Sequence, residues 1–218
     1  MPRTPRSSSR ILVFTLSMGV AALLSSQTLA TQSRATCPGV SAADNFFPRG
    51  ELYPESAELD AFEQHWYSQH LRAMGEPSLS CGQRDGEEVY RFLWLPSFQH
   101  PLAVRITHTG DGATLDVTEL TGAGGYDPGI VGRHEERKLT NAEWESLQAA
   151  LGAIDFWTMP TKPPPDPTVA HFDGAQWILE GHRAGSYHVV DRWSPEKSPY
   201  ANACLRFMDL AKRAASPE

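Results

Sequence analysis

The sequence predicts a single α+β domain: a mostly antiparallel sheet of about five to six strands with about three helices packed on it. Strand-like runs follow one another through short turns, which favours hairpins over parallel βαβ units. Helical patterns occur before, between and after these runs. At 218 residues the chain is long enough to bury one core without depending on disulfides.

The first 30 residues have the pattern of a secretory signal peptide. Arg3, Arg6 and Arg10 precede an apolar run over residues 11–24, and small residues follow up to Ala30. This run is short for a membrane span, so we expect no transmembrane segment in the mature chain. We predict an exported protein, periplasmic or secreted, divided into a signal peptide (1–30), an N-terminal extended segment (31–54), a single α+β domain (55–213) and a frayed tail (214–218).

The chain is acidic, with a formal net charge of −7. Removal of the predicted signal peptide takes away three positive charges and no acid, which leaves −10. This sign argues against binding to the nucleic-acid backbone or to anionic lipid, because both require a basic surface. The expected partner is an unknown protein or small molecule of the cell envelope, and not a nucleic acid.

The three cysteines are Cys37, Cys81 and Cys204, in a chain predicted to reach an oxidising compartment. Cys204 lies in an apolar helical pattern typical of a buried position, so we expect any disulfide to join Cys37 to Cys81. A lipid on Cys37 is not expected, because the residues before it lack the leucine usual in bacterial lipoproteins. The chain has no CxxC spacing, and we predict neither a metal site nor a cofactor.

An amphipathic helix is predicted over residues 56–74, where apolar residues recur at near-helical spacing. His65 and His70 lie five residues apart within it, so they do not share a helix face well and make a poor metal pair. A strand over residues 88–95 follows and stops at Pro96.

Residues 102–109 and 113–120 are predicted to form a hairpin. Asp111-Gly112 is a strong signal for a two-residue type I′ turn. This register places the apolar side chains of both strands on one face, whereas a three-residue loop would put them on opposite faces.

The glycine-rich segment TGAGGYDPG, over residues 121–129, has some likeness to a phosphate-binding loop. No Lys-Ser/Thr follows it, and residues 130–139 have the pattern of a strand, not of a helix whose N-terminus would hold a phosphate. We therefore expect a long connection here.

Thr140 and Glu143 have the spacing of a capping box at the start of a helix that reaches about residue 155. The proline-rich run over residues 160–167 excludes helix and central strand, so we expect an extended surface connection. A last amphipathic helix is predicted after Pro195.

Residues 174–195 combine a hairpin pattern with the densest set of chemically capable side chains. A two-residue turn would need a positive φ at Ala184, so we predict a three-residue loop that ends at Gly185. In this register Glu180 faces His188 on one side of the sheet. A carboxylate beside an imidazole suits acid–base chemistry, but an ordinary cross-strand charge pair has the same pattern.

The strings LTNAEWESLQAALGAIDFWTMP, DGAQWILEG and YHVVDRWSP, with a closing helix after them, resemble a group of uncharacterised exported proteins of Gram-negative bacteria. The resemblance covers roughly residues 88–210. It implies export and a single domain. It implies no activity and transfers no catalytic residue.

Three functions compete, and we favour a non-catalytic binding or inhibitory module with an aromatic-rich sheet. The first alternative is a hydrolase or metal-dependent enzyme that uses Glu180 and His188, with His100, His108 or Asp191 as additional candidates; no GxSxG or HExxH motif supports it. The second alternative is a structural envelope-associated protein whose aromatic residues are all core. The candidate binding residues are Arg91, Trp94, Trp177, Asp191, Arg192 and Trp193.

Overall fold

The structure is a computed structural model that describes residues 1, 46–81, 86–164, 173–195 and 197–214. In these residues the elements are α1 (Ala57–Ala73), β1 (Glu88–Pro96), β2 (Leu102–Thr109), β3 (Gly112–Leu120), β4 (Val131–Lys138), α2 (Asn141–Ala153), the 3-10 helix η1 (Phe156–Thr158), β5 (Ala175–Arg183), β6 (Ser186–Trp193) and α3 (Pro199–Ala214). The predicted signal peptide lies outside the described residues. None of the described helices has the length and apolar character needed to span a membrane.

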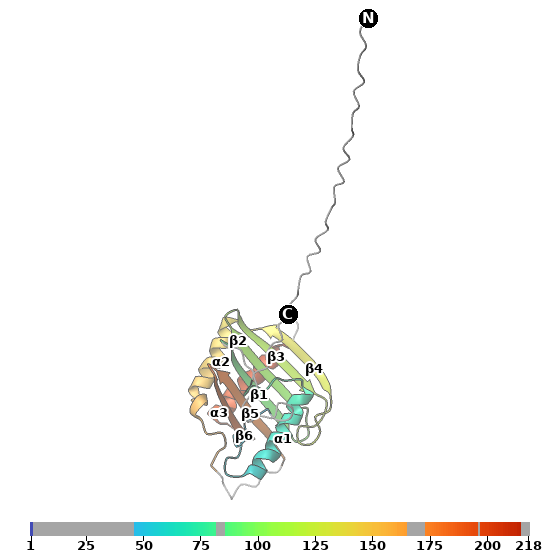
Figure 1. Cartoon of the computed structure of the whole chain (residues 1–218). Helices are drawn as coiled ribbons and strands as arrows, with labels where there is room; N and C mark the ends of the chain where they lie inside the picture. Colours follow the sequence, from blue (N-terminus) through green and yellow to red (C-terminus); the bar gives the residue numbers. More distant parts are fainter. Residues whose placement is uncertain (2–45, 82–85, 165–172, 196, 215–218) are drawn as a thin grey trace. The chain divides into compact units, whose positions relative to one another are not determined.

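The six strands form one antiparallel sheet in the order β4-β3-β2-β1-β5-β6 (Figure 1). The chain runs as a meander from β1 out to β4, passes through α2, and adds β5 and β6 on the other side of β1. The central strand β1 has the sequence EVYRFLWLP, rich in apolar residues as expected of a strand that is covered on both faces. The predicted α+β class is confirmed.

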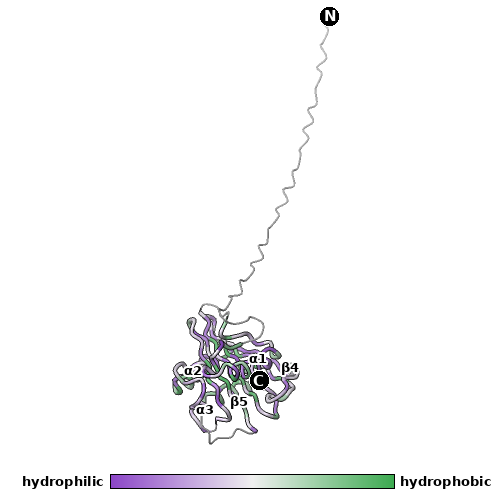
Figure 2. Tube along the Cα trace, turned by 60° about the horizontal axis from the view of Figure 1, so that its bottom comes forward, coloured by the Kyte–Doolittle hydropathy of each residue, from purple (hydrophilic) through white to green (hydrophobic). Residues whose placement is uncertain are grey.

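Different elements cover the two faces of the sheet, and apolar residues concentrate between the layers (Figures 1 and 2). On one face, Leu93 of β1 shares a core with Tyr67 of α1 and with Phe47. On the other face, Phe92 of β1 packs against Phe207 of α3, in a core that also includes α2 and η1. Successive side chains of β1 therefore enter two separate cores.

The start of α2 has the predicted capping box. Thr140 Oγ1 accepts a hydrogen bond from the backbone amide of Glu143, and the Glu143 carboxylate accepts one from the backbone amide of Thr140. Arg137 donates two further hydrogen bonds to Glu143. The bonds from Arg137 and from the cap lower the pKa of Glu143 to about 2, so this carboxylate stays charged and keeps the helix start fixed.

The cysteines agree with the predicted pattern as far as they are described. Cys204 is free and buried in α3. Cys81 is disulfide-bonded, which excludes a bridge between Cys81 and Cys204. Cys37, the predicted partner of Cys81, lies outside the described residues.

The β2–β3 hairpin has the predicted faces but a different turn. Thr109 pairs with Gly112, so Gly110 and Asp111 form the turn instead of Asp111 and Gly112. The pairing shifts by an even number of residues, so every side chain stays on its predicted face. Gly112 has a φ of 109°, a conformation that suits glycine.

The β5–β6 hairpin contradicts the predicted register. Ala184 and Gly185 form a two-residue turn, with φ of 48° and 77°. A left-handed alanine costs about 1–2 kcal/mol. The predicted register would have turned Asp191 toward the apolar core under α2 and α3, whereas the observed one gives this buried carboxylate Tyr67 and Lys162 as partners. An unpaired buried charge costs more than the strain at Ala184, so the two-residue turn prevails.

Replacing Ala184 by asparagine is expected to raise the free energy of unfolding by about 0.5–1 kcal/mol, because Asn-Gly is the preferred pair for this turn. Ala184 is exposed, so the change disturbs no packing. Urea unfolding should show a higher midpoint with an unchanged slope. The control Ala184→Val should lower the midpoint, since β-branched residues rarely adopt a positive φ. An asparagine variant less stable than the parent would contradict the left-handed turn.

The two edge strands are protected in different ways. β4 has the sequence VGRHEERK, and its many charges discourage pairing with another strand. The edge of β6 is covered by residues 159–162, which we call the strap. The backbone amide of Asp191 donates to the carbonyl of Thr161, and Arg192 donates to the carbonyls of Pro160 and Thr161. The strap follows η1 directly, so η1 and β6 are tied together.

Candidate functional site

Glu180 and His188 do not form the predicted pair, because they lie on opposite faces of the sheet. Glu180 points to the α1 side, where it binds Arg91. His188 points to the other side, where its ring packs edge-on against Phe156 and its Nε2 lies 2.8 Å from the carbonyl oxygen of Met159. The predicted acid–base pair is therefore wrong, because the observed pairing of β5 with β6 differs by one residue from the predicted one.

Glu180 belongs instead to a buried group of charges that we call the Arg91 cluster, formed by Glu76, Arg91, Arg105, Asp116 and Glu180. Arg91 Nη2 lies 2.6 Å from Glu180 Oε2, and Arg91 Nη1 lies 3.2 Å from Glu76 Oε2. Arg105 binds Glu76 at 3.0 Å and Asp116 at 3.2 Å. Burial acts to lower the pKa of Arg91, but Glu180 and Glu76 outweigh it and raise that pKa, so Arg91 stays charged.

A second group, the Asp191 cluster, consists of Glu63, Tyr67, Lys162, Gln176 and Asp191. Tyr67 donates a hydrogen bond of 2.8 Å to Asp191, and Gln176 donates another. Lys162, from the strap, binds both Asp191 and Glu63. Burial, and then the charge of Asp191, raise the pKa of Glu63. The cluster therefore ties α1, the strap and β6 to one another.

The central charges of both clusters are closed to solvent. Arg91, Glu180 and Asp191 are 0% exposed, so a substrate cannot reach them. Their polar atoms are occupied by the partners named above and, for Glu180, by a hydrogen bond of 2.9 Å from Tyr187. We interpret both clusters as connections that hold the α1 layer on the sheet.

An open groove lies where the ends of β1 and β5 meet the first turns of α3, with a volume of about 520 Å³. Trp94 and Trp177 pair directly across β1 and β5 and line it from the sheet. Leu205 lines it from α3 and is 42% exposed. Small-molecule sites have volumes of about 300–1,000 Å³, so the groove has a suitable size.

The connection between β6 and α3 shapes one side of this groove. Ser194 and Lys197 both line it and both have a positive φ, of 37° and 47°. Such conformations cost non-glycine residues about 1–3 kcal/mol each and cluster at ligand sites. Gly174 permits the arrangement, because a Cβ there would lie 2.5 Å from Ser194 Oγ and 2.8 Å from the ring of Trp193. The backbone conformations at this side of the groove therefore lower local stability.

Apolar surface continues beyond the groove on the β1 side. Phe98 lines the groove and is 67% exposed, and its ring centre lies 6.4 Å from that of Tyr126. Tyr126 comes from the glycine-rich segment, which packs closely on the end of β1. A Cβ at Gly124 would lie 2.8 Å from the backbone of Leu95, so glycine is needed there for contact. This close contact accounts for Gly124 in the connection.

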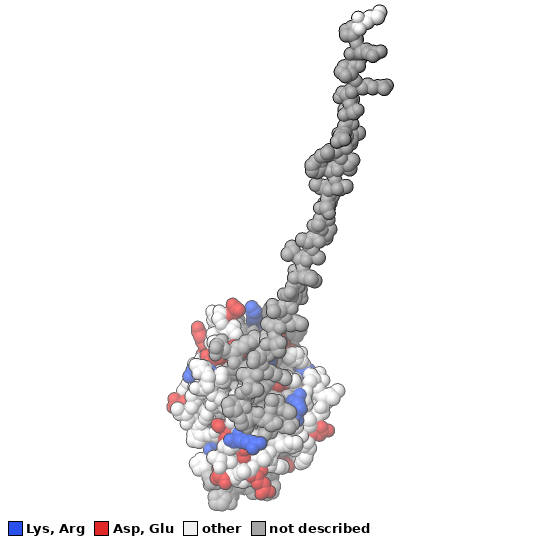
Figure 3. All heavy atoms as spheres, in the orientation of Figure 1, with Lys and Arg blue, Asp and Glu red and all other residues white. Residues whose placement is uncertain are grey.

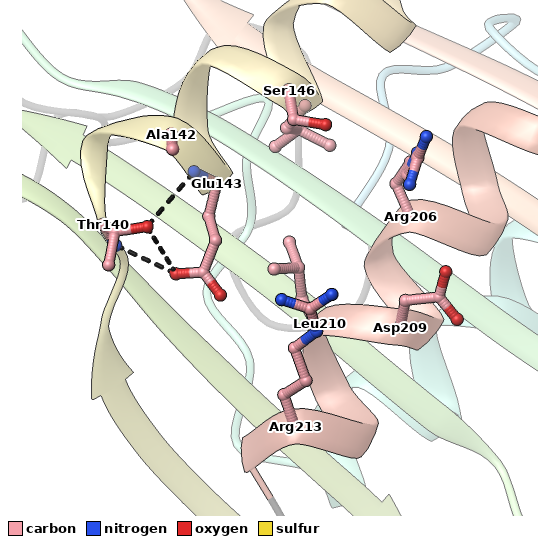
Figure 4. Close-up of a pocket in the computed structure, with 9 residues that line it drawn as sticks. Thr140, Ala142, Glu143, Ser146, Arg206, Asp209, Leu210 and Arg213 are labelled. Carbon is pink, nitrogen blue, oxygen red and sulfur yellow. Dashed lines mark hydrogen bonds between the residues drawn. The ribbon is translucent and has the colours of Figure 1, made fainter.

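A second hollow, of about 360 Å³, lies between α2 and α3. Figure 4 shows it lined by Thr140 and Glu143 at the start of α2, and by Arg206, Asp209 and Arg213 of α3. Glu143 is already occupied by the capping box and by Arg137. The lining mixes both signs of charge, so it selects no ligand of one sign. Charges of both signs are also interspersed on the face of the described part shown in Figure 3.

The candidate residues taken from the sequence have separate places in the structure. Trp94 and Trp177 line the groove, whereas Arg91 and Asp191 are buried in the two ion clusters. Arg192 holds the strap, and Trp193 does not line the groove but has its ring close to Gly174. His100 Nδ1 lies 3.0 Å from the carbonyl oxygen of Gly122, and His108 stacks on Trp144.

Sequence reasoning missed Phe98, Lys197 and Leu205 as groove residues. The signals for Phe98 and Leu205 were weak. Phe98 stands in a short loop between two prolines, and Leu205 broadens the apolar side of its helix beyond what burial requires. Lys197 has no signal in the sequence that marks it as a groove residue.

No protein-family model matches the chain, and no curated protein matches it. Within the described part of the chain, no group of three or more His, Cys, Asp or Glu residues is arranged to hold a metal ion. Fold and site together define an α+β protein with an open aromatic groove and two buried ion clusters.

Proposed function

We propose that this protein is an exported, non-catalytic binding module whose ligand site is the groove between β1, β5 and α3. The observation that carries the proposal is the pair Trp94 and Trp177, which lie half-buried side by side in an open groove. Aromatic side chains give large contact areas at small entropic cost, and a groove of this size suits one small molecule. The leader pattern of residues 1–30 supports export.

The alternatives have less support. An enzyme based on Glu180 and His188 lacks its pair, because the two side chains lie on opposite faces of the sheet. A purely structural protein would keep its aromatic residues in the core, whereas Phe98 and Tyr126 are 67% and 71% exposed beside the groove.

Leu205→Gln is expected to weaken binding of N-phenyl-1-naphthylamine, a neutral apolar fluorophore, by about fivefold or more, because it replaces apolar lining with an amide. A fluorescence titration measures this affinity. The matched control is Leu59→Gln: Leu59 is also an exposed helical leucine, 50% exposed, but it lies on α1 and does not line the groove. The control should bind as the parent does. Equal losses in both variants, or no saturable binding by the parent, would contradict the proposal.

A further inference from the structure

The groove carries a positive charge. Of the described residues that line it, Lys197 alone is charged. Its side chain is exposed and makes no ion pair or hydrogen bond with a described residue, although the chain has a net charge of −7. Ser194 also lines the groove, and its Oγ accepts a hydrogen bond from the backbone amide of Ala175, which leaves the hydroxyl hydrogen to donate to a ligand.

The charge lies at one end of the groove. Lys197 follows β6, whereas Phe98 follows β1, and β5 lies between these two strands. Two strand spacings correspond to about 10 Å, so the groove has a cationic end and an aromatic end at about that separation. Trp94 and Trp177 lie between the two ends, on β1 and β5. The groove therefore suits a molecule with an anionic head and an apolar body.

Backbone groups around the groove bond to one another. The amide of Ser97 donates to the carbonyl of Gly174 at 2.8 Å, and the amide of Ser194 donates to the carbonyl of Ala175 at 2.8 Å. β1 and β5 pair with each other, so no free strand edge is available for a bound peptide to extend. A peptide would leave its own amides unpaired there, whereas a hydrocarbon or ring has none to satisfy.

We propose that the ligand is a free carboxylic acid with an apolar body, whose carboxylate binds Lys197 and Ser194 and whose body lies against Trp94, Trp177 and Leu205. This inference rests on the proposed binding function and names the ligand class of the same groove. The aromatic end with Phe98 receives the far end of the body.

The test compares decanoate with 1-decanol, two probes with the same chain and different heads, by displacement of N-phenyl-1-naphthylamine at about pH 8. Decanoate should bind about threefold to fivefold tighter than decanol, as expected for one exposed charge pair. Lys197→Gln should remove this preference and leave the affinity for decanol unchanged, and Lys197→Glu should weaken decanoate binding about tenfold. The control Lys212→Gln makes the same change of charge outside the groove, at a side chain of α3 that is 73% exposed, and should have no effect.

Each other outcome overturns the ligand class. Equal affinities for decanoate and decanol, or equal effects of Lys197→Gln and Lys212→Gln, would show that Lys197 does not bind the head. Tighter binding of an apolar peptide with a free C-terminus would show that the occupant is a protein segment. In each case, the response of the neutral fluorophore to Leu205→Gln separately decides whether the groove is a ligand site.

Discussion

Replacing Arg91 by methionine is expected to lower the free energy of unfolding by about 3–5 kcal/mol. Arg91 is 0% exposed, and its guanidinium binds Glu180 and Glu76. Without it, the hydroxyl of Tyr187 is the one described group left to support the buried carboxylate of Glu180. Domains of this size are stable by about 5–15 kcal/mol, so the change removes a large share of the stability. Chemical unfolding followed by circular dichroism measures it.

The double variant Arg91→Met/Glu180→Leu provides the control. It removes both members of the buried pair, and Glu76 keeps Arg105 at 3.0 Å, so no cluster charge is left without a partner. We expect the double variant to be more stable than Arg91→Met by about 1–3 kcal/mol, since an uncompensated charge costs more than a missing pair. Additive losses from the two single substitutions would contradict the assignment of Glu180 as the main partner of Arg91.

Replacing Lys162 by methionine is expected to cost about 2–4 kcal/mol at about pH 8, because Glu63 and Asp191 would then face each other without a cation. The pKa of Glu63 is already raised above its usual 4.5 by burial and by Asp191. The folded state therefore takes up a proton more readily than the unfolded one, and ionisation of Glu63 reduces stability as the pH rises above 4.5. Loss of Lys162 raises this pKa further. The variant's loss in free energy of unfolding should therefore be smaller at about pH 5 than at about pH 8, by about 1 kcal/mol or more.

The lysine's own titration does not interfere in this range. Burial acts to lower the pKa of Lys162, but Asp191 and Glu63 raise it above the usual 10.5, so its contribution is fully present below that value. Lys212→Met, at a largely exposed side chain of α3, is the matched control and should change stability by less than about 0.5 kcal/mol at either pH. If Lys162→Met lowers the free energy of unfolding equally at both pH values, the carboxylates of Glu63 and Asp191 are not coupled.

Patterns within short segments predicted much of the fold. The two strand pairs, the capping box at Thr140 and the final helix all follow from spacing and turn chemistry that a few neighbouring residues determine. The register of β5 and β6 does not follow from such local patterns. It depends on whether Asp191 meets Tyr67, a residue 124 positions earlier in the chain, and on Lys162 of the strap. Long-range partners of a buried charge therefore overrode the local preference at Ala184.

Only part of the candidate site could be predicted from the sequence. Trp94 and Trp177 were recognised as chemically capable residues of the sheet, but Arg91 and Asp191 look the same in sequence and are buried. Exposure separates these two kinds of residue, and it depends on how α1 and α3 cover the sheet. Lys197 lines the groove with a positive φ, as Ser194 does, and neither conformation has a sequence signal.

We expect a ligand to occupy the groove beside Trp94 and Trp177, and the indole N–H signals of the six tryptophans test this most directly. Single Trp→Phe variants assign these signals in two-dimensional NMR spectra. The signals of Trp94 and Trp177 should then shift most when the protein is titrated with decanoate. The signals of Trp144 and Trp157, which pack around Tyr90 away from the groove, should stay in place. Shifts confined to Trp144 and Trp157, or no shift at Trp94 and Trp177, would contradict the account.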